Sequence, residues 1–452
     1  MEKKKKIEIR PYRTGRNLCP VRIVTPPDEP YIHTFFDVSP WSPSGRYLVC
    51  LRLPFEDREP SIGDKAGICI IDLKEETIRQ VYETGGWGMQ VAAHQQWGPT
   101  DRFLYFNDAE GGTDAEGGTD AEGGTVFTVE YDLENDTARR LNGPLYMLSP
   151  DGSYALGPSL TLINFIIKGY GVPIDRKTIT LPPMGPVATE GLWKTEVRTG
   201  NKTLLMSFRD MAERLPELGD TSNKFLFLFH TKLNKSGDRI MQVCRALSFN
   251  ETTKEKSWDR YIVTFRPDLS EMNLALAPEK WALGGHHPDW HPDGKHITMN
   301  LNTDGREMKF CRFRYDGSDF QVIQPELMGG GHPSITGDGR FLITDAYVEE
   351  PISRKNDETP LRLCGVDHLY ERIICYLRTL CEGSLRAYDK VTVAEKSPYA
   401  IDYIQRKQSA LDIYRLDPHP AWNRDYTQVC FNAAPEGRRQ VLIADVSLLL
   451  RD

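Results

Sequence analysis

Five of the ten histidines share one local setting, three residues before an apolar residue that opens a tight turn. They are His94, His230, His287, His332 and His419. An imidazole ligates metal ions and exchanges protons near neutral pH, because its unperturbed pKa is about 6.5. Structural histidines would scatter among positions, so the shared setting predicts a common functional site.

The turns after these histidines belong to a phrase that recurs seven times along the chain. An apolar anchor is followed by a turn of the Pro-Asp-Gly type and then by a run of β-branched and aromatic residues, which is the pattern of β-hairpins. A blade of four strands needs about 40–50 residues, so the longer intervals must contain insertions. We therefore predict an all-β fold, a seven-bladed β-propeller with loop insertions; a pair of β-sandwiches would not explain the repeat. The seven anchors are Trp41, Trp97, Leu148, Leu233, Trp290, Ile335 and Trp422.

The domain organisation follows from this repeat. Residues 1–36 form an N-terminal segment that closes onto the propeller, and residues 37–452 form the propeller itself. Insertions are expected at about 108–125 and 348–410. The first insertion contains DAEGGT three times over, which indicates an acidic, glycine-rich expansion of a hairpin in the second blade, with a calcium loop as the alternative. Within the second, residues 368–380 are predicted to form a short helix.

Equivalent positions of successive blades form a ring around the axis of a propeller. The five histidines should therefore converge at the mouth of the central channel, with Val38 and Leu145 taking this position in the first and third blades. Three of them come from neighbouring blades, and three imidazoles leave metal positions open for a substrate. His287, His332 and His419 are thus the predicted metal ligands.

The remaining two ring histidines, His94 and His230, are candidates for acid–base groups, because their pKa suits proton transfer at neutral pH. Three further histidines lie in the fifth blade and are alternatives for either role. The sequence leaves open which of two adjacent histidines points into the channel. The further histidines are His286, His291 and His296, and the adjacent pair is His286 and His287.

Composition excludes several classes of protein. Lys+Arg is 56 against Asp+Glu 64, and the formal charge of −8 argues against a nucleic-acid binder, which needs a basic face. The basic start is followed by no apolar region of a secretory signal, and the apolar stretch 160–167 is too short to cross a bilayer. Nine cysteines without paired CxxC spacing indicate buried thiols in a reducing compartment. We expect a cytoplasmic protein with no membrane partner.

Several phrases resemble a known family. They are Gln96-Trp97-Gly98-Pro99 with Leu104 to Asp108, His332-Pro333-Ser334 with Asp338 to Asp345, and Arg415 to Pro420 with Glu436 to Gln440. Together they are similar to the propeller-fold polysaccharide lyases, namely the oligogalacturonate lyases and the propeller ulvan lyases, which share a TolB-like seven-bladed architecture. The resemblance covers most of the chain from about residue 37 onward.

This resemblance implies β-elimination on an acidic oligosaccharide that contains uronic acid. The C6 carboxylate must be neutralised by a divalent cation (Mn, Zn or Ca) or by arginine, a base must take the C5 proton, and an acid must protonate the departing O4. Carried over to this chain, His94 would be the base and Tyr146 a candidate acid. His230 would contact the uronate or act as a second acid–base group, and the three predicted metal ligands would hold the ion.

The chain departs from the family in its substrate-binding cations. Relatives commonly carry an arginine in the stretch matching 160–170, where Lys168 is the only cation here. The fourth blade often has arginine directly after its histidine, but here Thr231 precedes Lys232, and lysine cannot form the same bidentate clamp. We predict that Lys168, Lys232 and Arg209 contact the substrate in place of these arginines.

The alternative hypothesis is a non-catalytic, TolB-like propeller that binds a peptide or glycan partner through its channel. A stoichiometric metal ion that is lost on mutation of His332 or His419 would favour the lyase. A serine hydrolase is rejected because the chain has no GxSxG elbow, and it has no P-loop or dinucleotide fingerprint.

Overall fold

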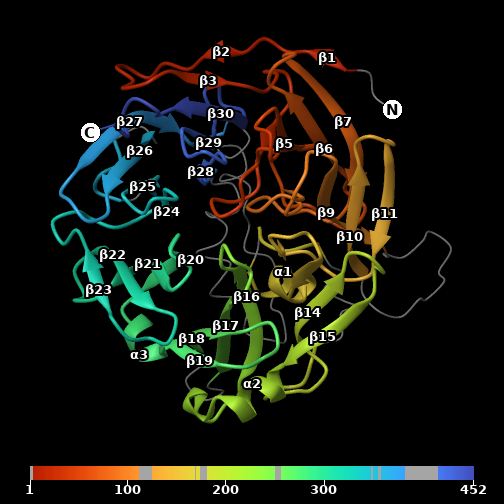
Figure 1. Cartoon of the computed structure of the whole chain (residues 1–452), viewed down its shortest axis with the longest axis vertical. Helices are drawn as coiled ribbons and strands as arrows, with labels where there is room; N and C mark the ends of the chain where they lie inside the picture. The colour runs from red at the N-terminus through yellow and green to blue at the C-terminus, as the bar shows by residue number, and fades with distance from the viewer. Residues whose placement is uncertain are drawn as a thin grey trace.

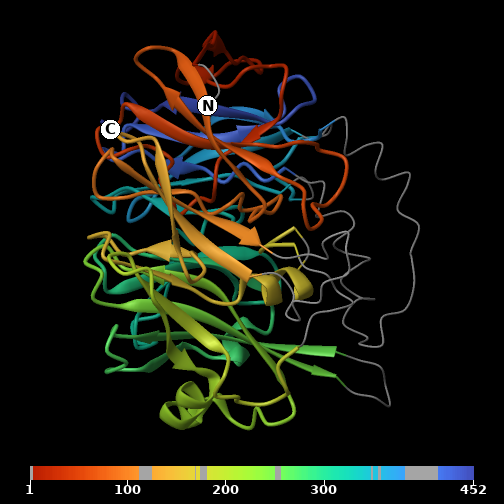
Figure 2. The ribbon, with the colours of Figure 1, turned by 90° about the vertical axis from the view of Figure 1, so that its right-hand side faces the viewer.

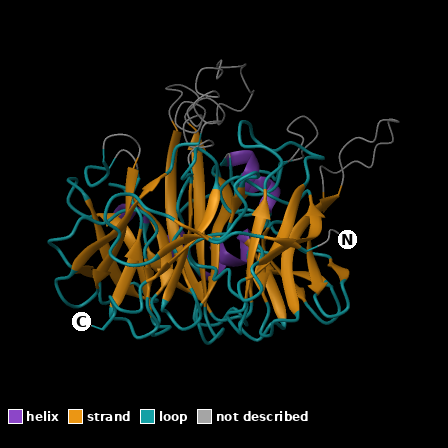
Figure 3. Cartoon of the chain, turned by 90° about the horizontal axis from the view of Figure 1, so that it is seen from above, coloured by secondary structure: helices purple, strands orange, loops and turns teal. Residues whose placement is uncertain are grey.

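The computed structural model describes residues 4–110, 125–167, 169–173, 181–249, 256–347, 350–354, 358–381 and 416–451. Seven antiparallel sheets are arranged around a central axis (Figure 1). Their strands run between the two faces of a disc, and loops cover both faces (Figures 2 and 3). The structure thus confirms the predicted all-β, seven-bladed β-propeller.

In each blade the innermost strand comes first among four or, in the seventh blade, three consecutive strands, and β1, β2 and β3 add to the outer edges of the first and seventh blades. The first blade contains β4 (Tyr31–Ile32), β5 (Tyr47–Arg52), β6 (Ala66–Asp72) and β7 (Thr77–Thr84), with β1 (Lys5–Lys6) on its outer edge. The second contains β8 (Gln96–Trp97), β9 (Phe103–Glu110), β10 (Thr125–Asp132) and β11 (Thr137–Leu141). The third contains β12 (Met147–Leu148), β13 (Tyr154–Gly157), β14 (Gly191–Glu196) and β15 (Lys202–Ser207).

The next three blades follow the same order. The fourth contains β16 (Phe225–Leu233), β17 (Ile240–Phe249), β18 (Lys256–Phe265) and β19 (Asn273–Leu276). The fifth contains β20 (Gly285–Trp290), β21 (His296–Asn302), β22 (Met308–Arg314) and β23 (Gln321–Ile323). The sixth contains β24 (Ser334–Ile335), β25 (Phe341–Thr344), β26 (Glu358–Gly365) and β27 (Glu371–Arg378). The helical elements are α1 (Leu160–Ile166), α2 (Phe208–Arg214), α3 (Pro278–Trp281) and the 3₁₀ turn η1 (Pro216–Leu218).

The seventh blade is built from both ends of the chain. It contains β28 (Ala421–Trp422), β29 (Gln428–Ala433) and β30 (Gln440–Asp445), and then β3 (Val21–Ile23) and β2 (Arg10–Pro11) on the outside. Val21 of β3 pairs with Ala444 of β30. Pairing the first part of the chain with the last closes the ring and covers an edge that β30 would otherwise expose.

The recurring turn has one backbone hydrogen bond in common in all seven blades. The backbone N–H of the residue after each anchor donates to the carbonyl five residues further on, at N···O distances of 2.8–3.0 Å. In five turns the fourth residue after the anchor is a glycine with φ between 68° and 77°, a conformation that glycine adopts without strain. Tyr426 takes the equivalent place in the seventh blade with φ 60°. The turn chemistry therefore sets the same strand register in each repeat.

Three of the tryptophan anchors also join neighbouring blades. The indole N–H of Trp97 donates to Pro40 O, that of Trp290 to Lys232 O, and that of Trp422 to Ser334 O. Each acceptor stands one residue before the anchor of the preceding blade. The apolar core lies between the blades, so a tryptophan can fill this space while its one polar group is satisfied.

The predicted helix over 368–380 is wrong. Residues Glu371–Arg378 form β27, which pairs with β26 as the outer strand of the sixth blade. The run contains two isoleucines and one tyrosine, residues that suit a pleated, half-buried surface. Strands therefore occupy part of the expected insertion at 348–410. In the second blade β9 and β10 pair as far as Glu110 and Thr125, and the repeat at 111–124 with its calcium alternative lies outside the described residues.

Within the described ranges, the helices are all too short or too polar to cross a bilayer.

Candidate functional site

The five histidines stand at equivalent places just before or within the innermost strands, and their exposed fractions are only 0–6%. Four of them have positive φ values between 49° and 57°, namely His94, His230, His287 and His419. The fifth, His332, follows Gly331, whose φ is 59°. A left-handed residue other than glycine is uncommon, and its repetition at one position is typical of a site where strain serves function.

Phe35, which lies between β4 and β5, touches four of the five histidines. The centroid of its ring lies 4.6 Å from that of His419, 5.7 Å from His332, 5.8 Å from His230 and 6.1 Å from His287. The imidazoles also contact one another, with His287 stacked on His332 at 3.8 Å and His332 edge-on to His419 at 4.3 Å. The fold therefore brings together residues that are far apart in the chain, around an aromatic side chain that the repeat did not reveal.

His94 joins this group through Tyr146. The Tyr146 ring lies 4.6 Å from the His94 ring, and Tyr146 Oη shares a hydrogen bond of 2.9 Å with His230 Nδ1. The backbone around Tyr146 is held from the second blade, because Gln96 Nε2 donates to Tyr146 O and Asn107 Nδ2 donates to Leu145 O. The three candidate acid–base residues of the sequence are thus in one contiguous cluster.

The electrostatic surroundings of His94 and His230 differ. Burial lowers the pKa of His94 to about 4, while the Asp37 carboxylate acts in the opposite direction. Burial lowers the pKa of His230 well below its usual value, and the positive charges of Lys232 and Arg245 lower it further. Both imidazoles are therefore neutral near pH 7, and His94 has the surroundings that better stabilise an added proton. Burial raises the pKa of Tyr146, so its hydroxyl keeps its proton.

The described residues contain one buried group whose donor set suits a metal ion. One ligand atom each from His332, Asp417 and His419 lie within 4.8 Å of one another. The Nε2 atom of His332 is buried, and none of the residues that the structure describes forms a hydrogen bond with it. A buried, unsatisfied nitrogen is costly unless something coordinates it, so these residues fit a divalent cation.

Asp345 orients His332 for this role. Both carboxylate oxygens of Asp345 lie 3.0 Å from His332 Nδ1, and the backbone N–H of His332 donates to Oδ1 at 2.6 Å. A carboxylate on Nδ1 holds the proton there and leaves the Nε2 lone pair for a metal. Asp345 stands ten residues after its anchor, and asparagines at the same position in three other blades hold neighbouring backbone groups; they are Asn107, Asn300 and Asn432.

The four histidines of the fifth blade lie in two separate places, one in the ring and one at the turn that leads into β21. The predicted ligand His287 lies in the ring with its Nδ1 2.7 Å from Gly331 O, and it lies outside the His332–Asp417–His419 group. His286 is adjacent, with its Nδ1 2.9 Å from His287 Nδ1. His291 lies in the turn before β21 and His296 is the first residue of β21; both contact Asp293, so the structure does not place them in the ring.

The predicted substrate contact Lys232 is fully buried. Its ammonium lies 2.8 Å from Asp37 and 3.4 Å from Asp289, and it stands over the Phe36 ring at 4.3 Å. The pKa of Asp289 is raised to about 6 by burial, with Lys232 opposing this shift. This lysine therefore ties the segment before β5 to the fourth and fifth blades.

Arg209, another predicted substrate cation, does not lie in the ring. Arg209 is an exposed residue of α2, which follows the outer strand β15 at the periphery of the molecule (Figure 1). Helix α2 begins there because Ser207 caps it, in a capping box with Asp210. The prediction that Arg209 contacts a substrate beside the histidines is therefore corrected, because Arg209 lies at the periphery of the molecule. Lys168 lies outside the described residues.

Sequence reasoning missed four residues of this site. Asp345 shares its repeat position with Asn107, Asn300 and Asn432, and this recurrence of a polar residue is the signal in the sequence for it, whereas Asp417 has no polar counterpart in the other blades. Phe35 and Asp37 precede the first anchor, so the repeat carries no signal for them.

No protein-family model matches the sequence, and no curated protein matches it significantly. Among solved structures, an "oligogalacturonate lyase in complex with manganese" is similar over 98% of this chain and 97% of its own length, with a TM-score of 0.60 and 13% identity. An oligogalacturonate lyase from Vibrio parahaemolyticus is similar over 98% of both chains, with a TM-score of 0.61 and 14% identity. A putative TolB from Agrobacterium tumefaciens has a TM-score of 0.36, 14% identity, and coverage of 70% of this chain and 90% of its own. The chain has the propeller fold of the oligogalacturonate lyases, as its sequence phrases predicted.

Proposed function

We propose that this protein is a metal-assisted lyase that cleaves uronate-containing oligosaccharides by β-elimination. The observation that carries the proposal is the pairing of two buried clusters in one ring, His94–Tyr146–His230 and His332–Asp417–His419. Phe35 contacts members of both clusters. The fold shared with oligogalacturonate lyases, one of them described with manganese, supports the same function.

The reaction balances without an external oxidant or a water molecule. A base removes the C5 proton, and the electron pair of the C5–H bond forms the C4–C5 double bond. The C4–O4 bond breaks, and O4 leaves with its electron pair and takes a proton. The chain must therefore supply one proton acceptor, one proton donor and positive charge near the C6 carboxylate.

His94 is the proposed base and Tyr146 the proposed acid. His94 is neutral near pH 7, and Asp37 stabilises the imidazolium that forms when it takes the C5 proton. Tyr146 keeps its proton until O4 departs, because burial raises its pKa. Its hydrogen bond to His230 Nδ1 holds the phenol in place and gives the proton a route to or from a second imidazole.

The proposed metal ligands are His332, Asp417 and His419. Two imidazoles and a carboxylate suit Mn or Zn better than Ca, which prefers an all-oxygen set. A bound divalent cation would supply positive charge that makes the C5 proton of a uronate more acidic. Asp345 keeps His332 Nε2 directed to this position.

The substrate in this proposal is a short acidic oligosaccharide, because side chains that are 0–6% exposed suit the end of a chain better than the middle of a polymer. Purified protein with Mn²⁺ should generate the near-ultraviolet absorbance of a C4–C5 unsaturated uronate from at least one of a panel of pectic, ulvan and glycosaminoglycan oligomers. His94→Ala and Tyr146→Phe should each lower kcat by about 10²–10⁴-fold. His368→Ala, at an exposed histidine of the sixth blade, is the control.

A metal-free protein that is inactive on the whole panel would overturn the proposal. That outcome would favour a non-catalytic propeller that binds a partner through its channel.

A further inference from the structure

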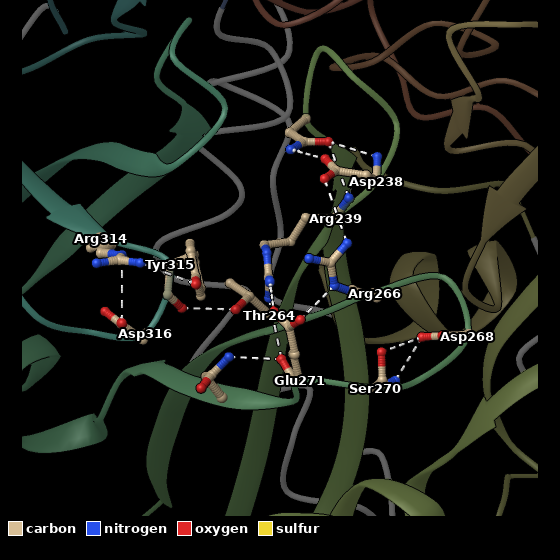
Figure 4. Close-up of polar contacts among 12 residues, drawn as sticks. Asp238, Arg239, Thr264, Arg266, Asp268, Ser270, Glu271, Arg314, Tyr315 and Asp316 are labelled. Atoms are coloured by element: carbon tan, nitrogen blue, oxygen red, sulfur yellow. Dashed lines mark hydrogen bonds and ion pairs between the residues drawn. The ribbon is translucent and has the colours of Figure 1, made fainter.

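Two arginines of the fourth blade stand side by side, and no carboxylate of the described residues pairs with either. Arg245 on β17 pairs directly with Arg260 on β18, so both side chains leave the same face of the sheet. Among the described residues, neither guanidinium has an ion pair, and Arg245 Nε is buried with no hydrogen-bond partner. In the same blade, by contrast, Arg239 and Arg266 both pair with Glu271 (Figure 4).

This arrangement is costly for the protein on its own. Burial and, to a smaller extent, the positive charge of Arg260 together lower the pKa of Arg245 to about 10. Burial also lowers the pKa of Arg260. Buried donors are nearly always satisfied in folded proteins, and two like charges on paired residues of one sheet face are destabilising. An anion between the guanidinium groups would remove both costs.

The surroundings of the pair are aromatic. The Arg245 guanidinium carbon lies 4.9 Å from the centroid of the Phe229 ring, and Phe227 pairs with Arg245 across the strands. Trp258 stands two residues before Arg260 on the same face of β18, is partly exposed, and contacts the Phe227 ring edge-on at 5.8 Å. Flat aromatic surface beside fixed cations suits a sugar ring that carries an acid group.

The pair also adjoins the proposed acid–base cluster. The Phe229 ring lies 3.9 Å from the His230 ring, and the charge of Arg245 lowers the pKa of His230. A ligand held by Arg245 would thus lie on the fourth-blade side of His230 and Tyr146.

We propose that Arg245 and Arg260 form a carboxylate-binding subsite for a uronate of the substrate, with Trp258 as the surface against which its ring packs. The inference rests on the proposed function and deepens it. It gives Arg245 and Arg260 the substrate-binding role that the sequence analysis predicted for Arg209 and Lys232. A guanidinium binds a carboxylate through two parallel N–H···O bonds, which a lysine cannot form.

Calorimetric titration of Arg245→Gln and Arg260→Gln tests the subsite. All proteins carry Tyr146→Phe to prevent cleavage, and the probes are a galacturonic acid trimer, its neutral methyl ester and a sulfated neutral trisaccharide. Each arginine variant should bind the acid trimer about tenfold or more weakly and the ester unchanged, since a charge-assisted hydrogen bond is lost. Arg306→Gln, at an exposed arginine of the fifth blade, should bind like the parent. Unchanged affinity for the acid trimer, no binding by the parent, or tighter binding of the sulfated sugar would overturn the assignment.

Thermal unfolding without ligand separates a binding role from a structural one. Arg245→Met should melt no lower than the parent, because it removes an unsatisfied buried group. A clear drop in melting temperature would indicate a structural arginine and would overturn the inference.

Parallel assays distinguish the two proposals. If the wild type eliminates the trimer but Arg245→Gln leaves its KM unchanged, the subsite is wrong and the lyase stands. If the trimer binds through the arginines but no chain eliminates it, the lyase is wrong and the subsite stands.

Discussion

At the scale of single residues, the chemistry of the ring depends on which nitrogen of each imidazole is available. Asp345 contacts Nδ1 of His332 and Gly331 O contacts Nδ1 of His287, so Nε2 is the nitrogen left to coordinate an ion in both rings. The two histidines differ in their partners, because His332 has a carboxylate at Nδ1, whereas His287 has a neutral carbonyl there and its Nε2 lies 3.4 Å from Tyr347 Oη.

Asp345→Asn tests this orientation. The amide retains the shape of the carboxylate but not its charge, so the affinity for Mn²⁺ should fall about 10–100-fold in a calorimetric titration. Asp338→Asn, at the exposed turn of the same blade, should leave the affinity unchanged. Equal affinities of the two variants would show that Asp345 does not orient a metal ligand.

Acid should destabilise the fold through the buried His94. A histidine in the unfolded chain takes up a proton below about pH 6.5, but the pKa of folded His94 is lowered to about 4 by burial. Between these values the unfolded chain binds more protons, so stability falls as the pH falls, by about 3 kcal/mol for this residue. Urea unfolding between pH 7 and pH 4.5 should show a shallower pH dependence for His94→Asn than for the wild type. Identical slopes would contradict the burial of a neutral imidazole.

At the scale of elements, the segment between β4 and β5 positions the ring. It carries Phe35 between the histidines, and Asp37 anchors it to Lys232 of β16. The anchor turns hold the inner strands, and this segment fills the space that the strands enclose.

Lys232→Met should therefore act on stability. Removing one partner of a buried ion pair leaves Asp37 and Asp289 with uncompensated charge, and we expect a loss of about 3–5 kcal/mol in the free energy of unfolding. Lys235→Met, at an exposed lysine three residues further on, should change it by less than about 0.5 kcal/mol. A stable Lys232→Met protein that loses only substrate affinity would restore the substrate role that the sequence suggested.

At the scale of the whole molecule, the ring is closed by strands from both ends of the chain. β3 pairs with β30, and Val21 and Ile23 pack in the core cluster shared by the sixth and seventh blades. Closure holds the seventh blade, which supplies Asp417 and His419, against its neighbours.

Truncation of residues 1–24 should open this closure. It removes β3, exposes the edge of β30 and should abolish cooperative thermal unfolding or cause aggregation. Truncation of residues 1–9 removes only the outer strand β1 and should leave the transition largely intact. Similar melting curves for the two truncations would show that β3 does not close the propeller.

The sequence predicts the repeat well because turn chemistry is local. Trp41, Leu148 and the other anchors are followed by residues that favour one turn, and this turn sets the register in every blade. The ring position follows from the same register. The identity of the metal-binding residues does not follow from the register. It depends on the direction of the Asp417 side chain and on the hydrogen-bond partner of each imidazole. The error at Glu371–Arg378 has a similar cause, since a short apolar run is compatible with helix or strand until its neighbour is known.

The most direct test of the central claim is the mass of the products formed from a galacturonate oligomer with Mn²⁺. Elimination splits the sugar without adding water, so the masses of the two fragments should sum to that of the substrate, and one fragment should carry the C4–C5 double bond. We predict this result for the wild type and its loss in His332→Asn. Fragments whose masses sum to the substrate plus one water would show hydrolysis, and intact oligomer would show no cleavage; either result would contradict the account.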